Sequence, residues 1–321
     1  MLKDTQKKNR NLINIVTTAV VLALLFSLPI WGSPFLVLFC TLIFMYATLG
    51  QMWNLLTGYA GLVSLGQQTF VALGGFTLGI FSNYFGMPML PGILIGGLAS
   101  AVLAAIMCFI FLRMKGMYFA IATWITAEAF KVLFASWQYV GGGTGLFISG
   151  ARGIGTTTVY YYSLVLIVVS IIIVVFLLRS KPGLGLIAMK GDAGAAETCG
   201  LNIFRTRLLC MMLAGYITSL AGGVIYMSQV WVSPYAAFAI SWTVASMFIV
   251  VIGGIGTVGG PIVGAVVYVF LNQYLARLGG ISMAILGVIA VIVIIFAPKG
   301  IVGTLQEKAG FEIFSLRRSS D

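Results

Sequence analysis

The fold of this chain is decided by the stretch Val159-Tyr-Tyr-Tyr-Ser-Leu-Val-Leu-Ile-Val-Val-Ser-Ile-Ile-Ile-Val-Val-Phe-Leu-Leu178, which contains no charged residue. A helix needs about 20 apolar residues to cross a bilayer, so this stretch predicts a membrane span. Of the 321 residues, 60% are hydrophobic and 8% are charged, whereas soluble domains average about 45–50% and 25%. The alternation of an outer-membrane barrel is absent. We therefore expect one all-α, polytopic transmembrane domain over residues 1–321.

Apolar runs bounded by charge, glycine or proline predict about ten spans, with a range of eight to ten. They cover residues 12–31, 34–53, 59–82, 92–112, 117–137, 159–178, 208–230, 238–254, 261–278 and 281–297. With a cytoplasmic N-terminus, 15 of the 18 Lys and Arg residues fall on the cytoplasmic side. This positive-inside bias predicts that both termini are cytoplasmic, N-in and C-in.

The composition argues against an enzyme. The chain has no histidine, and its four cysteines show no CxxC spacing. Histidine is the usual metal ligand and the usual base of a serine or cysteine nucleophile, so we predict neither catalytic residues nor a metal site. No GxxxxGK[ST] phosphate-binding motif occurs. We expect this chain to bind no cofactor itself, so that any ATP and Mg²⁺ would be bound by another subunit.

Two connecting segments are long enough to have functions. The extracytoplasmic segment 138–158 is rich in glycine and carries one charge, Arg152, which suits a cap over a pathway or a plain connector. In the cytoplasmic segment 179–207, Pro182 can open a short helix that Gly200-Leu-Asn202 closes. That helix would be amphipathic, so it could lie in a groove of a partner or rest on the membrane surface.

Two glycine-rich stretches interrupt the apolar runs. The candidate pathway residues in them are Asn54, Gly58, Gly61, Ser64 and Gly66 in the first, and Gly253, Gly254, Gly256 and Thr257 in the second. Irregular backbone at membrane depth is tolerated where protein or a water-filled cavity satisfies its polar groups, and paired breaks are typical of transport pathways. Close helix packing through small residues is the alternative.

Glu128 and Lys131 are the charges that lie well inside a predicted span, three residues apart on one helical face where they can pair. Intramembrane charges usually face the bundle interior or water. We interpret the pair as a polar point on the pathway or at a subunit interface. A pair that merely neutralises itself, with Lys131 reaching the interface, is the alternative.

An ordered set of motifs resembles a known family. These motifs are Asn54-Leu-Leu-x-Gly58-Tyr-x-Gly61-x-x-Ser64-Leu-Gly66-x-x-x-Phe70, Tyr118-Phe-Ala-Ile-Ala-Thr123 with Glu128, Gly142-Gly143-Thr144-Gly145, Gly200-Leu-Asn202, Gly253-Gly-x-Gly256-Thr-x-x-Gly260-Pro261-x-x-Gly264-Ala265 and Pro298-Lys-Gly300. The chain resembles the permease subunits of high-affinity branched-chain amino acid ABC importers, specifically the longer of the two permease types. The resemblance runs from about residue 46 to 303.

The resemblance implies a multi-pass protein in the plasma (inner) membrane of a prokaryote. Its expected partners are a second, similar permease, two cytoplasmic ATP-binding subunits, an extracytoplasmic substrate-binding protein and membrane lipid, with no nucleic acid. Residues 183–202 would form the helix that couples to the ATPases. The residues expected in this coupling segment are Gly185, Lys190, Asp192, Ala195, Ala196, Glu197, Gly200 and Asn202.

The chain departs from the family pattern at Lys190-Gly191-Asp192-Ala193-Gly194, which is poorer in charge than usual, so contacts to the ATPase would differ. The resemblance implies leucine, isoleucine and valine as substrates, while relatives import urea, short amides or other amino acids. From another class, an ion-coupled secondary transporter or channel also fits the intramembrane glycines and the charged pair.

Overall fold

The computed structural model describes residues 17, 20–114, 116–180, 182–183, 185–186, 202–275, 281–296 and 299–309. The helices are Val20–Trp31, α2 Pro34–Asn54, α3 Gln67–Phe85, α4 Met89–Phe111, α5 Met117–Ser136, α6 Thr156–Arg179, α9 Ile203–Gln229, α10 Pro234–Ala237, α11 Ser241–Gly253, α12 Gly260–Leu275, α13 Ile281–Phe296 and α14 Gly300–Ala309. A π-helical turn, η1 Leu55–Tyr59, continues α2. The remaining elements are three 3-10 turns, η2 Gln138–Val140, η3 Gly142–Thr144 and η4 Ser149–Ala151, and two short strands, β1 Leu146–Phe147 and β2 Trp231–Val232.

The predicted all-α membrane fold is confirmed, but ten spans are not. Six helical segments in the described part of the chain are long and apolar enough to cross a bilayer. They are Pro34–Tyr59, Met89–Phe111, Met117–Ser136, Thr156–Arg179, Ile203–Gln229 and Pro234–Gly253. Three further apolar helices are shorter, Val20–Trp31, Gly260–Leu275 and Ala284–Val293.

The span predicted at 59–82 was wrong at its start, because α3 begins only at Gln67. The residues before it are irregular, with Gly61 in the left-handed region at φ +65° and Gly66 as the N-cap. A left-handed residue breaks helical hydrogen bonding, and glycine adopts that conformation without steric cost. Hydropathy alone does not distinguish this irregular backbone from helix.

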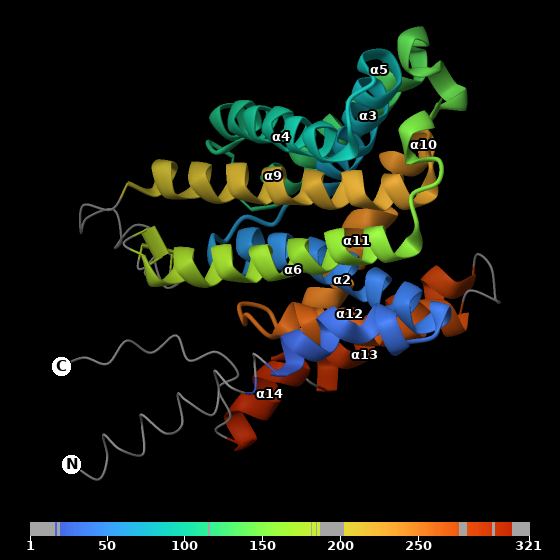
Figure 1. Cartoon of the computed structure of the whole chain (residues 1–321). Helices are drawn as coiled ribbons and strands as arrows, with labels where there is room; N and C mark the ends of the chain where they lie inside the picture. The colour runs from blue at the N-terminus through green and yellow to red at the C-terminus, as the bar shows by residue number, and fades with distance from the viewer. Residues whose placement is uncertain are drawn as a thin grey trace.

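Helix α9 lies inside the bundle, with α3 and α4 on one side and α2 and α6 on the other (Figure 1). Backbones approach closely there because glycines face them. A Cβ added at Gly74 would lie 2.0 Å from the carbonyl oxygen of Ser219, and one at Gly222 would lie 2.2 Å from that of Val71. Small residues permit this packing in membrane proteins. Helices associate there through van der Waals contact, because the hydrophobic effect does not drive them together in lipid.

The C-terminal helices form the other half of the molecule: α11 and α12 pack against α2, and α13 and α14 pack against α11 and α12 (Figure 1). A second hydrophobic cluster fills this half, built around Phe44, Ile249 and Val269. Helix α2 therefore connects the two halves, since its residues contribute to both clusters.

A compact cap covers one end of the bundle. Strands β1 and β2 pair antiparallel in the register Leu146↔Val232 and Phe147↔Trp231. The side chain of Asn83, near the end of α3, donates to the carbonyl oxygen of Phe147 at 2.6 Å and accepts from the amide of Ser149 at 2.9 Å. The predicted loop at 138–158 is thus folded onto α3, and it ends earlier than expected because α6 begins at Thr156.

Candidate functional site

The two glycine-rich stretches meet in space, although they lie about 200 positions apart in the sequence. The first connects α2 to α3, and the second connects α11 to α12. We call residues 51–66 and 253–260 together the glycine junction. Since α3 runs from the junction to the cap, the junction lies at the opposite end of α3 from the cap.

Asn54 holds the junction together. This residue is fully buried; its Nδ2 donates to the carbonyl oxygen of Thr257 at 2.9 Å, and its Oδ1 accepts from the amide of Gly256 at 2.8 Å. Nearly one turn earlier on α2, Gln51 Nε2 donates to the carbonyl oxygen of Val258 at 2.8 Å. Two carboxamides on one helix face therefore satisfy three successive residues of irregular backbone, as backbone polar groups away from water require.

The glycines of the junction are required by its geometry. A Cβ on Gly58 would lie 2.3 Å from Oδ1 of Asn54 and 2.7 Å from the backbone nitrogen of Gly256. Gly254 and Gly256 adopt φ values of +126° and +76°. Residues other than glycine rarely adopt such backbone conformations. Gly254 also lies against the start of α14, where a Cβ on Gly300 would come within 2.5 Å of its Cα.

Thr257 shapes the turn between α11 and α12. Its hydroxyl donates to the carbonyl oxygen of Gly254 at 2.8 Å and accepts from the amide of Gly260 at 3.1 Å. Gly253 packs so tightly that an added Cβ would overlap the carbonyl oxygen of Gly260. Close packing therefore accounts for Gly253 and Gly260, while a role of this stretch in the pathway stays a prediction.

The first stretch is anchored at its far end to α5. The amide of Leu65 donates to the hydroxyl of Thr123 at 3.1 Å, and a Cβ on Gly66 would lie 2.5 Å from the carbonyl oxygen of Thr123. Ser64 is buried; its carbonyl oxygen accepts from the indole of Trp53 at 3.0 Å and its Oγ from the amide of Gly66 at 3.3 Å. Gly61 is exposed, with nothing within 4 Å of an added Cβ. The left-handed backbone of the turn therefore accounts for a glycine at this position.

Glu128 and Lys131 form the predicted ion pair on α5, between Oε2 and Nζ. Their side chains are 37% and 26% exposed in the isolated chain. The structure therefore places the pair on the outer surface of α5 rather than within the core of this chain. A surface position favours an interface or lipid-facing role over a pathway enclosed by this chain.

Sequence reasoning missed a group of buried polar side chains on the first turn of α3. Gln67 Nε2 donates to the carbonyl oxygen of Leu49 at 2.8 Å, which links α3 to α2. Gln68 Oε1 accepts from the hydroxyl of Thr243, which links α3 to α11. Gln67 and Gln68 are at most 4% exposed. Adjacent glutamines after a glycine stretch, ahead of an apolar run, were the signal that could have found them.

The predicted coupling segment falls mostly outside the described residues. Lys190, Asp192, Ala195, Ala196, Glu197 and Gly200 all lie there. Gly185 is described and is buried in a short helical stretch. The prediction that Gly200-Leu-Asn202 closes a helix stays a prediction, because residues 187–201 lie outside the described residues. Asn202 itself opens α9 as the N-cap, where its side chain accepts from the amide of Arg205 at 2.9 Å. Asparagine is among the preferred N-cap residues because its side-chain oxygen replaces a missing helical acceptor.

The described residues contain no group of three or more His, Cys, Asp or Glu side chains that could hold a metal. The fold is a polytopic helical bundle. Two glycine-rich stretches interrupt its helices, and buried carboxamide side chains hydrogen-bond to the irregular backbone there. Interrupted helices of this kind, packed in a polytopic bundle, are typical of membrane transport proteins.

The chain belongs to the family described as branched-chain amino acid transport system, permease component, whose model matches residues 35–298. The high-affinity branched-chain amino acid transport system permease proteins LivM of Salmonella typhimurium and Escherichia coli are each 27% identical to it over 291 residues, covering 81% of this chain and 68% of each relative. The probable branched-chain amino acid transport permease protein LivH of Methanocaldococcus jannaschii is 26% identical over 142 residues, covering 41% of this chain and 44% of the relative. No solved structure matches the chain significantly.

Proposed function

We propose that this chain is a transmembrane permease subunit of an ATP-driven ABC importer that carries leucine, isoleucine and valine into a prokaryotic cell across the inner membrane. The observation that carries the proposal is the family match over residues 35–298, which includes both glycine breaks. The longer relatives that match this chain are named as branched-chain amino acid permeases.

In this proposal the chain works with a second permease, two cytoplasmic ATP-binding subunits and an extracytoplasmic binding protein that delivers the substrate. Residues 183–202 would dock on an ATP-binding subunit. The cytoplasmic placement expected from the charge distribution supports this assignment. Closure of the ATP-binding subunits would shift the bundle between two packings.

The glycine junction is our candidate for the part of the pathway that changes between those packings. Hydrogen bonds from Gln51 and Asn54 to backbone groups join the two stretches there. Such hydrogen bonds can break and re-form, because a carboxamide that leaves one backbone group can bind another or water.

The test is to express the tagged chain with its chromosomal neighbours, purify it in mild detergent and identify the co-purifying chains by mass spectrometry. The complex is then reconstituted, and uptake of radiolabelled leucine is measured with and without internal ATP. We expect a second permease and P-loop ATPases in the complex, and uptake that requires ATP. A stable particle of this chain alone, with uptake abolished by a protonophore, would contradict the proposal and favour an ion-coupled transporter.

The coupling assignment has its own test. Ala195→Pro should abolish ATP-dependent uptake while the complex still assembles in the membrane, because proline breaks a helix interior at a cost of about 3 kcal/mol. Uptake retained in this variant would contradict the assignment of residues 183–202 and leave the importer proposal standing.

A further inference from the structure

Helix α3 begins inside the bundle and not at one of its ends. Its first residue is Gln67, whose Nε2 donates to the carbonyl oxygen of Leu49 at 2.8 Å and to the hydroxyl of Thr218 at 3.4 Å. Leu49 lies near the middle of the span Pro34–Tyr59, and Thr218 lies near the middle of the span Ile203–Gln229. The N-terminus of α3 therefore lies near the middle of the membrane-spanning bundle.

The backbone donors of this first turn lack acceptors. The N-cap residue is Gly66, which has no side chain that could cap the helix. The amide of Thr69 donates to the carbonyl oxygen of Gly66 at 3.0 Å, but no described residue accepts from the amides of Gln67 and Gln68. The first N–H groups of a helix have no partner within it, and together they carry about half a positive charge. The turn thus presents unpaired donors and a positive pole to the bundle interior.

Side chains of the same turn add further unpaired polar atoms. Oε1 of Gln68 accepts from the hydroxyl of Thr243, but Nε2 of Gln68 has no acceptor among the described residues. Oε1 of Gln67 has no donor there either. Gln67 is 4% exposed, and Gln68 and Thr243 are fully buried. Buried polar groups are nearly always hydrogen-bonded, so these atoms call for a polar partner that the described chain does not supply.

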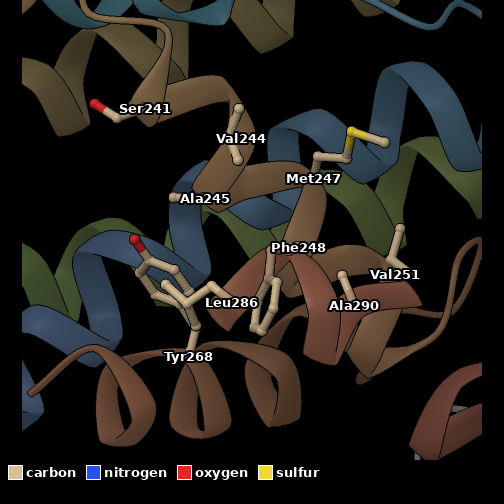
Figure 2. A pocket seen from close by; sticks show the side chains of 10 residues that line it. Ser241, Val244, Ala245, Met247, Phe248, Val251, Tyr268, Leu286 and Ala290 are labelled. Atoms are coloured by element: carbon tan, nitrogen blue, oxygen red, sulfur yellow. The ribbon is translucent and has the colours of Figure 1, made fainter. Parts of the chain in front are cut away.

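The turn lies at the boundary between the two halves of the molecule, because Gln68 is on α3 and Thr243 is on α11. A different face of α11 borders an apolar groove with α12 and α13, whose lining includes Ala245, Phe248 and Ala290 (Figure 2). Thr243 does not line this groove. Helix α11 therefore directs a polar side chain toward α3 and an apolar face elsewhere.

A carboxylate has the chemistry that this turn lacks. It only accepts hydrogen bonds, so it can pair with two amides and a carboxamide N–H at once. Helix N-termini bind anions through such amides and through the helix dipole, and broken membrane helices direct their N-termini at anionic substrate groups. The side-chain and backbone partners of the turn, Leu49, Thr218 and Thr243, are uncharged. None of them can supply the negative charge, so we look for it in a ligand.

We propose that the first turn of α3 binds the α-carboxylate of the transported amino acid through the amides of Gln67 and Gln68 and the carboxamide of Gln68. The inference rests on the proposed function. Oε1 of Gln67, which lacks a donor, offers an acceptor for the α-ammonium group. Because the turn is buried in this structure, the amino acid reaches it in the packing in which α11 has moved away from α3.

The first experiment uses the whole reconstituted importer and compares two variants that remove the same hydrogen bond. Gln68→Met removes the carboxamide, whereas Thr243→Val leaves Nε2 of Gln68 in place. We expect Thr243→Val to lower the efficiency of ATP-dependent leucine uptake by no more than about twofold, and Gln68→Met to lower it at least about tenfold, the effect of losing one hydrogen bond to a charged group.

Cysteine accessibility tests the same site without relying on a loss of uptake. Gln68→Cys is made in a background without the four native cysteines, and the complex is treated with a charged, membrane-impermeant methanethiosulfonate. We expect modification only while the importer hydrolyses ATP, and we expect leucine to slow it. Val71→Cys is the matched control, since Val71 is fully buried on the same helix and packs against Gly222; it should stay unmodified in every state.

The outcomes separate the two proposals. A wild-type complex without ATP-dependent leucine uptake contradicts the proposed function. A complex that takes up leucine, with equal losses in Gln68→Met and Thr243→Val, overturns the carboxylate site alone, because Gln68 then only joins α3 to α11. A Gln68→Cys complex that stays unmodified in every state also overturns it. Modification that leucine does not slow overturns it as well, and assigns the unpaired groups to water.

Discussion

Replacing Asn54 by alanine should loosen the glycine junction without unfolding the bundle. The change removes the acceptor for the amide of Gly256 and the donor to the carbonyl oxygen of Thr257. Leaving a buried polar group unpaired costs about 1–3 kcal/mol. Gly256 and Thr257 are half-buried, so water compensates in part and the low end applies to each group. We expect a total cost of about 2–3 kcal/mol at the junction.

Hydrogen exchange measured by mass spectrometry on a peptide covering 255–258 tests this value. Since every 1.4 kcal/mol is a factor of ten in an equilibrium constant, the opening that exposes the Gly256 amide should become about 30- to 140-fold more populated. Exchange at that amide should accelerate by the same factor if opening and closing are fast. The effect should be local, because the two hydrophobic clusters keep all their side chains.

Asn83→Ala is the matched control. Asn83 also uses its carboxamide to donate to one backbone carbonyl and accept from one backbone amide, but it does so at the cap. We expect this variant to speed exchange at Ser149 and to leave peptide 255–258 unchanged. Unchanged exchange at 255–258 in Asn54→Ala would refute the reasoning that this side chain holds the two stretches together.

Three further outcomes are expected. Gly58→Ala should lower the thermal stability of the purified chain, because its Cβ would come 2.7 Å from the Gly256 nitrogen. The control Gly155→Ala, whose Cβ would have nothing within 4 Å, should be neutral. Equal melting temperatures of the two variants would contradict the close approach. The double swap Glu128→Lys with Lys131→Glu should reach the membrane in larger amounts than either single change, because it preserves the ion pair; equal amounts of all three on a membrane immunoblot would argue that each charge is solvated separately. Asn202→Ala should destabilise the start of α9 by about 1 kcal/mol through loss of the N-cap, seen as faster exchange at Arg205; unchanged exchange there would contradict the capping role.

Much of the fold could be predicted from the sequence because hydropathy reports directly on burial in lipid. Val159–Leu178 has no charge, and it becomes α6 with nearly the predicted bounds. The pairing of Glu128 with Lys131 also followed from local spacing, since residues three apart share a helix face. These inferences depend only on residues that are close together along the chain, and the sequence shows those directly.

The start of α3 shows where local reasoning fails. Residues 60–66 are apolar enough to be read as part of a span, yet they form irregular backbone held by Thr123 and Trp53. The partners that stabilise this backbone come from other helices. A pattern within the stretch does not reveal them.

The sequence by itself determined that this chain is a helical membrane protein with two glycine-rich interruptions, because composition and periodicity are properties of single segments. Only the tertiary structure decided that the interruptions meet and that Asn54 and Gln51 bind the second one. It also decided that residues of α11, α12 and α13, among them Ala245 and Ala290, line one apolar groove. Those contacts join residues far apart in the chain, and their geometry is fixed by how whole helices pack.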